Sequence, residues 1–216
     1  MIDNPYTLLG EHPGQKIHSM KAHTLPSTEK DLEIEVKLKI VSPEKLRAQI
    51  KTLGFHERCH REFEDNWVLD FPERSLLRKR CLLRLRRFEG KSVLTFKGPR
   101  TKSAHFKIRE ELETEVSDGG TFHKILDRLG FVPVFRYQKY RSMFVKARSG
   151  RSTAVAISID ETPIGNYLEI EGTPETIRKI AEKLGYGPRS FILQSYLELY
   201  TQEKPRPQDR KMTFKK

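Results

Sequence analysis

The sequence has 216 residues, of which 36% are hydrophobic and 32% charged, and its formal net charge is +12. This length suffices for one domain with a substantial core. No stretch approaches the roughly 20 apolar residues of a membrane helix, and the N-terminus lacks the basic and apolar segments of a signal peptide, so we expect a cytoplasmic protein with no membrane partner.

The two ends of the chain differ from its middle. Residues 201–216 contain six Lys or Arg and two acidic residues, so they supply +4 of the net charge. They contain prolines and no periodic apolar pattern, which predicts a solvated, basic C-terminal tail. Residues 1–30 are interpreted in the same way, as a flexible N-terminal extension. The folded domain is therefore predicted to span residues 31–200.

Four helices are predicted. Three of them end in Leu-Gly followed by an aromatic residue, and two of these begin with a hydroxyl residue and a proline, at Ser42-Pro43 and Thr173-Pro174. A hydroxyl N-cap followed by proline favours the start of a helix, and glycine suits the left-handed position after its last turn. The remaining Leu-Gly helix lies near residues 119–129, and the fourth helix is predicted at about 189–200.

Eight strands are predicted from period-two alternation of apolar and polar residues. They lie at about residues 31–40, 62–70, 80–88, 92–98, 105–116, 134–147, 153–160 and 166–171. This number and spacing of strands predict an α+β fold, in which an eight-stranded antiparallel β-barrel has helices packed outside.

The predicted strands divide charged from apolar residues. In residues 32–40, Glu33, Glu35 and Lys37 share one face while leucine, isoleucine and valine occupy the other. On a single strand such a charged face is usually solvated. Five further strands repeat the division, however, and their charged faces carry Arg84 and Arg86, Lys97, Lys139 and Arg141, Asp160, and Glu169 and Glu171.

The helices decide which face of the barrel looks inward. Their apolar stripes need an apolar sheet surface to pack on, so the charged faces should converge on the barrel interior. Unpaired charges there would be very costly, and the interior must therefore hold compensating partners. Carboxylates suit Mg²⁺ or Mn²⁺, and Arg and Lys suit phosphoryl oxygens. The pattern predicts a phosphate-chain ligand together with a divalent metal.

A further charged run leaves two interpretations open. Glu111 and Glu113 share a face with Arg109. They could extend the lining of the interior, or they could form an ordinary ladder of cross-strand ion pairs on the surface.

The sequence resembles a known family. Glu33-Ile34-Glu35-Val36-Lys37 is similar to the ExExK signature of the CYTH superfamily, the triphosphate tunnel metalloenzymes. The match extends, in order, through the following segments: Leu83–Arg86, Leu94–Pro99, Lys139–Arg141, Ile159-Asp160 and Leu168–Gly172. The resemblance covers about residues 31–200 and implies an eight-stranded antiparallel tunnel.

The resemblance also implies roles for individual residues. Glu33, Glu35, Asp160, Glu169 and Glu171 would bind the metal, which is Mg²⁺ or Mn²⁺. The triphosphate would be held by Lys37, Arg84, Arg86, Lys97, Lys139 and Arg141, of which Lys37, Lys97 and Arg141 are the predicted catalytic residues.

The branch of the family decides the expected reaction. Phe63–Trp67 with Asp70, and Ser195–Leu199, are similar to the bacterial class IV adenylyl cyclase-like branch. The expected substrate is a small-molecule triphosphate. It would be ATP in a cyclase that makes cyclic AMP and pyrophosphate, or ATP, tripolyphosphate or thiamine triphosphate in a triphosphatase.

Other groups are not assigned to the chemistry. His56, His60 and His105 are predicted to lie on the surface, and no histidine falls in the charged array. Cys59 and Cys81 belong to no CxxC motif, which argues against a disulfide framework or a structural zinc site and indicates buried or half-buried thiols.

One alternative belongs to another class of function. The net charge would also suit a non-catalytic binder of polyphosphate or nucleic acid. Such a binder gains nothing from burying five carboxylates, so nucleic acid is not the expected partner. The oligomeric state is left open, and a homodimer is one expectation.

Overall fold

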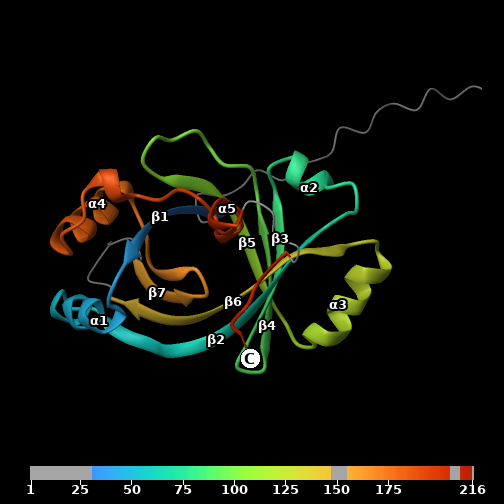
Figure 1. The fold of residues 1–216 in the computed structure, drawn as a ribbon, viewed down its shortest axis with the longest axis horizontal. Helices are drawn as coiled ribbons and strands as arrows, with labels where there is room; N and C mark the ends of the chain where they lie inside the picture. Colours follow the sequence, from blue (N-terminus) through green and yellow to red (C-terminus); the bar gives the residue numbers. More distant parts are fainter. Residues whose placement is uncertain (1–30, 147–154, 205–209, 216) are drawn as a thin grey trace, which may run out of the picture.

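The computed structural model describes residues 31–146, 155–204 and 210–215; the predicted extension at residues 1–30 lies outside them. Eight antiparallel strands close into a barrel in the order β2-β3-β4-β5-β1-β8-β7-β6, and β6 pairs back onto β2 (Figure 1). The predicted barrel is therefore confirmed. The strands are β1 Leu32–Ile40, β2 His56–Asp70, β3 Leu82–Phe88, β4 Lys91–Lys97, β5 Lys107–Val116, β6 Val132–Val145, β7 Ala156–Thr162 and β8 Gly165–Glu171.

Three of the predicted helices form with the expected end signals. They are α1 Pro43–Thr52, α3 Gly119–Arg128 and α4 Pro174–Lys183. The hydroxyls of Ser42 and Thr173 accept the capping hydrogen bonds of α1 and α4, and each such cap stabilises a helix by about 1 kcal/mol. Asp118 caps α3, which explains how a helix can begin on two glycines.

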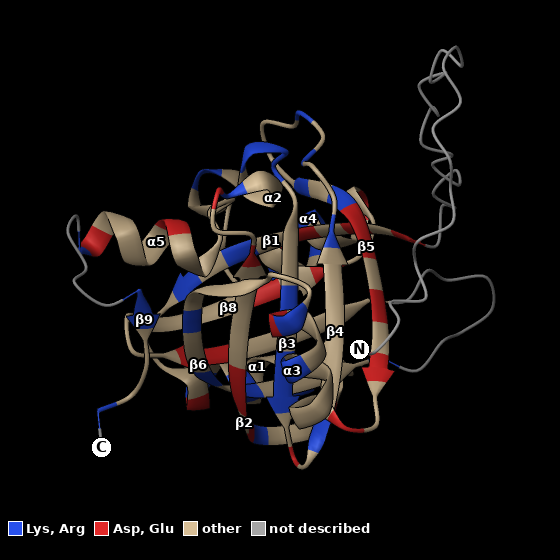
Figure 2. Ribbon diagram, turned by 90° about the vertical axis from the view of Figure 1, so that its right-hand side faces the viewer, with Lys and Arg blue, Asp and Glu red and all other residues tan. Residues whose placement is uncertain are grey.

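The apolar faces of the strands point outward and are covered by helices. The helices α1 and α4 pack on β1, β7 and β8, around Val36, Leu38 and Ile170, while α3 packs on β3 and β4 beside Leu85. The charged faces of the same strands therefore line the barrel interior, as predicted. Figure 2 shows basic residues along β3 and acidic residues along β5.

The fourth helix begins later than predicted. Helix α5 spans Tyr196–Glu203 and starts at a capping box of Ser195 and Glu198, so the prediction of a helix from residue 189 is wrong. The residues before it are used differently: Ile192 exchanges two backbone hydrogen bonds with Lys37, of 2.8 and 3.2 Å. Strand β1 pairs with β5 only as far as Glu35, and Ile192 satisfies the backbone groups that β5 leaves free.

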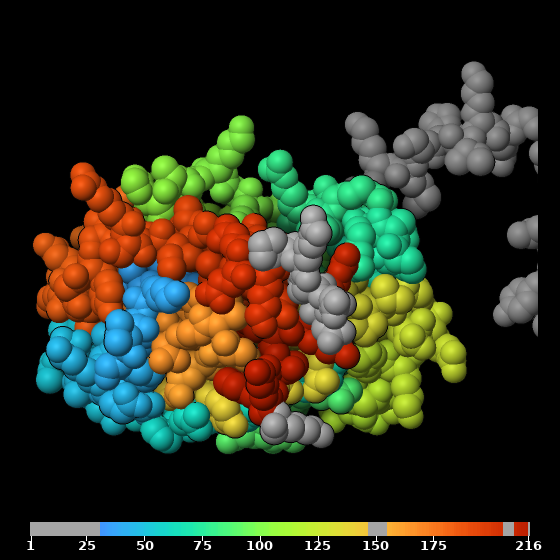
Figure 3. Space-filling model, in the orientation of Figure 1, coloured from blue at the N-terminus to red at the C-terminus, as the bar shows by residue number. Residues whose placement is uncertain are grey.

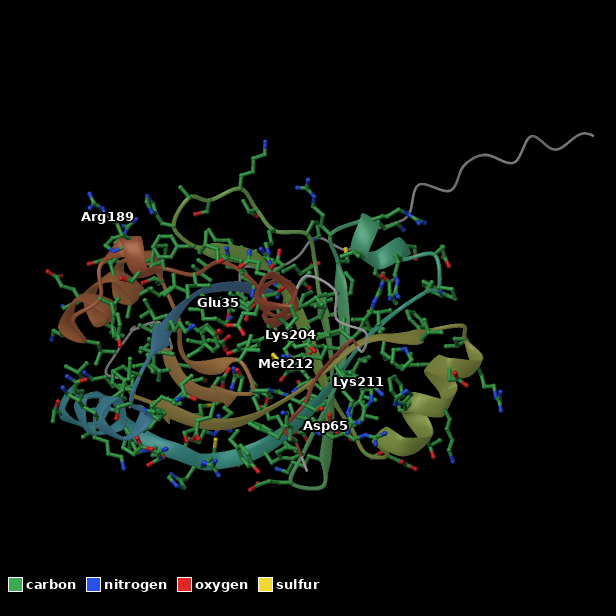
Figure 4. All side chains as sticks on the ribbon, in the orientation of Figure 1. Glu35, Asp65, Arg189, Lys204, Lys211 and Met212 are labelled. Carbon is green, nitrogen blue, oxygen red and sulfur yellow. The ribbon has the colours of Figure 1, made fainter. Side chains whose placement is uncertain are left out.

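The C-terminal residues also depart from the prediction. Strand β9, Lys211–Met212, runs parallel to β6, and the side chain of Met212 is buried among aromatic residues of the barrel (Figure 4). The prediction of a solvated tail is therefore wrong for these residues. Helix α5 lies across the middle of the face shown in Figure 3. Short helix α2, Ser75–Arg78, follows β2. No helix of the described residues is long and apolar enough to cross a membrane.

Candidate functional site

A cavity of about 300 Å³ lies inside the barrel. We call it the tunnel. Its lining includes every predicted site residue except Asp160, namely Glu33, Glu35, Lys37, Arg84, Arg86, Lys97, Lys139, Arg141, Glu169 and Glu171. Five different strands supply these side chains, so closure of the barrel brings together residues far apart in the sequence.

Four carboxylates gather where β5, β1 and β8 pair. We call Glu33, Glu35, Glu111 and Glu171 the carboxylate quartet; Glu35 is labelled inside the barrel in Figure 4. Glu35 and Glu171 lie directly opposite each other in the β1–β8 register, an arrangement that is unfavourable for two like charges. Burial, and then the neighbouring carboxylates of the quartet, raise the pKa of Glu171 to about 7. Glu171 is therefore the member of the quartet whose negative charge the protein offsets least, since the pKa of Glu111 is lowered instead.

Two lysines stand between members of the quartet. The Lys97 ammonium nitrogen lies 2.9 Å from Glu33 and 2.6 Å from Glu111, and Lys107 forms an ion pair with Glu35. Burial lowers the pKa of Lys107 to about 8, assisted by Lys37 and Arg109 and opposed by Glu35. These lysines offset part of the charge, and Glu171 forms no ion pair with another described residue.

A neighbouring group of charged side chains, on β8, β7 and β6 and at the start of α5, is arranged differently. We call Asp160, Lys139, Arg141, Glu169 and Tyr196 the Asp160 cluster. Asp160 accepts hydrogen bonds from the Lys139 ammonium at 2.8 Å, from two nitrogens of Arg141 at 2.7 and 2.6 Å, and from the Tyr196 hydroxyl at 2.7 Å. Glu169 pairs with Arg141 and, at 2.8 Å, with Lys37. Burial opposes the charge on Glu169, but Lys37 and Arg141 outweigh it and hold its pKa well below the usual value.

Asp160 does not line the tunnel, and of the other predicted metal ligands it lies beside Glu169, with which it shares the Nη2 atom of Arg141. Its side chain is fully buried, and both oxygens are occupied by donors of the protein. It lies behind Lys139 and Arg141 and fixes where these cations point into the tunnel. This geometry fits a positioning residue, and the metal-binding role of Asp160 stays a prediction.

A third set of contacts surrounds the two arginines of β3. Arg84 donates to the hydroxyls of Thr95 and Tyr137, at 3.1 and 3.3 Å, and Arg86 donates to Glu113 at 3.0 Å. The Nε atoms of both arginines are buried, and neither has a hydrogen-bond partner in the described protein. Both Nε–H groups are therefore free to donate hydrogen bonds to a bound anion.

The tunnel also contains residues that the sequence left open or did not assign. Arg109, Glu111 and Glu113 line the tunnel. They therefore extend the charged lining of the interior and are not a surface ladder of ion pairs. Lys107 has the same strand parity as Arg109, and that parity could have identified it. Tyr196 could not be found in this way, because it reaches the tunnel from the end of a helix.

The remaining candidates lie where the sequence predicts. His56, His60 and His105 are exposed, and Cys59 and Cys81 are half-buried free thiols. Burial, and then the nearby Glu62 carboxylate, raise the pKa of the Cys59 thiol to about 11. None of these five residues lines the tunnel.

The carboxylate quartet fits a divalent cation in its chemistry and its charge. Hard cations prefer carboxylate oxygens, and a nearby positive charge would relieve the repulsion that raises the pKa of Glu171. Across residues 31–146, 155–204 and 210–215, no three Asp, Glu, His or Cys side chains are already grouped closely enough to hold an ion together. Metal binding would therefore require Lys97 and Lys107 to leave their carboxylate partners.

Comparisons with known proteins agree with this geometry. The model of the CYTH domain family matches residues 31–196. A Methanocaldococcus jannaschii protein named "Putative adenylate cyclase" is 28% identical over 179 residues, which cover 78% of this chain and 98% of that protein.

Solved structures show the same fold. A Pyrococcus horikoshii protein has a TM-score of 0.64 and 28% identity, with 80% of this chain and 99% of that chain covered. A Hippeastrum protein, described as an adenylyl cyclase homologue with a dominant triphosphatase activity, has a TM-score of 0.54 and 17% identity, with 82% of this chain and 98% of that chain covered. At that identity the likeness concerns the fold alone.

Proposed function

The chain belongs to the CYTH domain family, and we propose that it is a divalent-metal-dependent enzyme acting on a triphosphate in the tunnel. The observation that carries this proposal is the division of the lining into the carboxylate quartet, in which Glu171 has no ion-pair partner among the described residues, and a separate set of fixed cations. A polyphosphate with its metal has the complementary charges, positive toward the quartet and negative toward the cations.

Within this proposal, Glu33, Glu35 and Glu171 hold Mg²⁺ or Mn²⁺. The ion supplies charge neutralisation at phosphoryl oxygens and a lowered pKa for the attacking hydroxyl or water. Glu169 completes the set of carboxylates at the tunnel wall, but it is tied to Lys37 and Arg141.

The cations of the tunnel bind and orient the triphosphate. Arg84 and Arg86 present forked donors suited to phosphoryl oxygens. Asp160 holds Lys139 and Arg141 in place. These side chains therefore need to move little when negative charge develops on the phosphate in the transition state. Phosphoryl transfer depends mainly on positioning and electrostatics, and the array provides both without a dedicated general base.

The leading reaction is adenylyl cyclisation. The 3′-hydroxyl of ATP attacks the α-phosphorus, its proton is lost to solvent, the bond to the β-phosphate oxygen breaks, and pyrophosphate leaves. The name of the M. jannaschii relative supports this choice. The second candidate is triphosphate hydrolysis, in which water attacks a terminal phosphorus, and the activity described for the Hippeastrum protein supports it.

One substrate panel separates the two reactions. Purified protein is incubated with ATP, GTP, thiamine triphosphate and tripolyphosphate, with Mg²⁺ or Mn²⁺, and the products are identified. Cyclic AMP with pyrophosphate supports the cyclase; orthophosphate from tripolyphosphate without cyclic AMP replaces it with the triphosphatase. Binding that survives EDTA, with no turnover of any substrate, would indicate a non-catalytic polyanion binder instead.

A further inference from the structure

A second cavity, of about 320 Å³, adjoins the tunnel. It lies between the barrel wall, short helix α2 and helix α5. Four residues line both spaces: Val68, Leu82, Phe135 and Leu197. The second cavity is therefore a neighbour of the phosphate-binding tunnel and is not a separate surface depression.

The shared residues place the second cavity next to the arginines of β3. Leu82 precedes Arg84 by two residues on the same face of β3, and Phe135 precedes Tyr137 in the same way on β6. Residues two apart on a strand are separated by about 7 Å. Arg84 and Tyr137 are joined by a hydrogen bond of 3.3 Å. A sugar attached to a phosphate near this pair could thus span this distance and carry a further group into the second cavity.

The walls of the second cavity are mainly apolar. Its lining includes leucine and valine side chains of the barrel, Leu77 of α2, and Leu197 and Tyr200 of α5. Apolar walls with few polar groups are typical of sites for small organic molecules. Charged phosphate oxygens are disfavoured in such a space, because they would lose their hydration there.

Arg74 supplies an unused donor at this cavity. Its backbone is in the left-handed region, with φ of 62°, which costs a non-glycine residue about 1 kcal/mol or more. The turn is held by the Asp70 carboxylate, which accepts backbone N–H groups from Phe71, Leu76 and Leu77 at 2.8 to 3.0 Å. Nη1 of Arg74 is buried, and no described residue accepts a hydrogen bond from it.

The charge of the second cavity selects among organic groups. Arg74 and Arg210 both line it, and its one acidic residue, Asp70, is occupied by the backbone donors. A cationic ring would face two guanidinium groups without a free carboxylate. A neutral, flat ring with nitrogen or oxygen acceptors would pack against the apolar walls and accept a hydrogen bond from the Arg74 guanidinium.

We propose that the second cavity binds the base of a nucleoside triphosphate. This inference rests on the proposed function and narrows its substrate class. An inorganic triphosphate leaves the second cavity unused, and thiamine triphosphate is disfavoured because its thiazolium ring is cationic. The part of the wall formed by Leu197, Tyr200 and Arg210 lies beyond residue 196, where the match to the family model ends.

Isothermal titration with Mg²⁺ tests the inference, using ATP, thiamine triphosphate and tripolyphosphate as ligands. Two variants alter the second cavity: Arg74→Met removes the donor, and Thr201→Phe fills the space. Arg128→Met is the matched control, because Arg128 is an exposed arginine at the end of α3 outside both cavities. Circular dichroism establishes that each variant is folded.

Each cavity variant should weaken ATP binding about tenfold, the equivalent of one lost charged hydrogen bond or an excluded ring. Tripolyphosphate affinity should change less than about twofold, and the control should change neither. Equal losses for ATP and tripolyphosphate, unchanged ATP binding in both variants, or wild-type affinity for thiamine triphosphate equal to that for ATP would each overturn the base site while leaving the proposed function intact. Failure of the wild type to bind any of the three ligands would instead contradict the proposed function.

Discussion

The carboxylate quartet and the Asp160 cluster both contain carboxylates and belong to the same barrel, yet they differ in charge balance. Every oxygen of Asp160 is matched by a donor of the protein. In the quartet, Glu171 faces Glu35 across two paired strands, and its pKa rises to about 7. A carboxylate that is already satisfied orients its neighbours, whereas one that repels its neighbours is available to a ligand.

The largest expected effect concerns turnover. Glu33→Gln or Glu171→Gln replaces one carboxylate of the quartet with a neutral amide. We expect the rate of triphosphate cleavage to fall about a thousandfold, the size of effect seen when an enzyme loses one group that stabilises charge in the transition state. Steady-state assays at saturating Mn²⁺ measure the change. Glu175→Gln, an exposed acidic residue of the first turn of α4, serves as the control. A loss of less than about tenfold would mean that the quartet is not the metal site.

The next effect concerns folding stability. Asp160→Asn leaves Lys139 and Arg141 buried without their shared anion, and we expect the free energy of unfolding to fall by about 3 kcal/mol. Glu171→Gln relieves repulsion instead and should leave it unchanged or raise it. Urea unfolding of both variants, without metal, makes the comparison. If Asp160→Asn is the milder change, the two regions have been assigned the wrong way round.

A smaller effect concerns pH. The pKa of Glu171 is raised to about 7, and a metal binds the ionised carboxylate. Protonation therefore competes with the metal below the pKa and no longer competes above it, so Mn²⁺ affinity should rise about tenfold between pH 6 and pH 8. Calorimetry in buffers of different ionisation heat should also detect a released proton near pH 7. A flat profile in this window would show that Glu171 is not a ligand.

The smallest effect concerns Tyr196. Tyr196→Phe removes one of the donors to Asp160 and should cost about 1 kcal/mol of unfolding free energy. Because Lys139 and Arg141 still hold Asp160, metal affinity should not change. A drop in Mn²⁺ affinity would mean that the Asp160 cluster and the carboxylate quartet are coupled.

Much of the fold followed from local patterns. The N-caps at Ser42 and Thr173 and the strand parity around Glu33 and Arg84 are decided by residues close in the sequence. These signals were sufficient to place helices outside the barrel and charges inside it. They were sufficient, too, to bring all but one of the predicted site residues into one cavity.

The errors arose where distant residues decide the structure. Ile192 forms a bridge to Lys37 because β5 leaves those backbone groups unpaired, which no helix signal near residue 190 reports. Met212 is buried by aromatic residues of the barrel. The metal-binding role of Asp160 stays a prediction, and the sequence does not report that the donors to its carboxylate come from β6 and α5. The sequence alone cannot tell a satisfied carboxylate from an available one.

The most direct test of the central claim is the Mn²⁺ affinity of three proteins without any triphosphate: the wild type, Glu171→Gln and Asp160→Asn. Electron paramagnetic resonance counts free Mn²⁺ and does not depend on turnover. We predict that Glu171→Gln weakens Mn²⁺ binding by at least about tenfold, while folded Asp160→Asn retains the wild-type affinity. Equal affinity of Glu171→Gln and the wild type, or a selective loss in Asp160→Asn, would contradict the assignment of the metal to the carboxylate quartet.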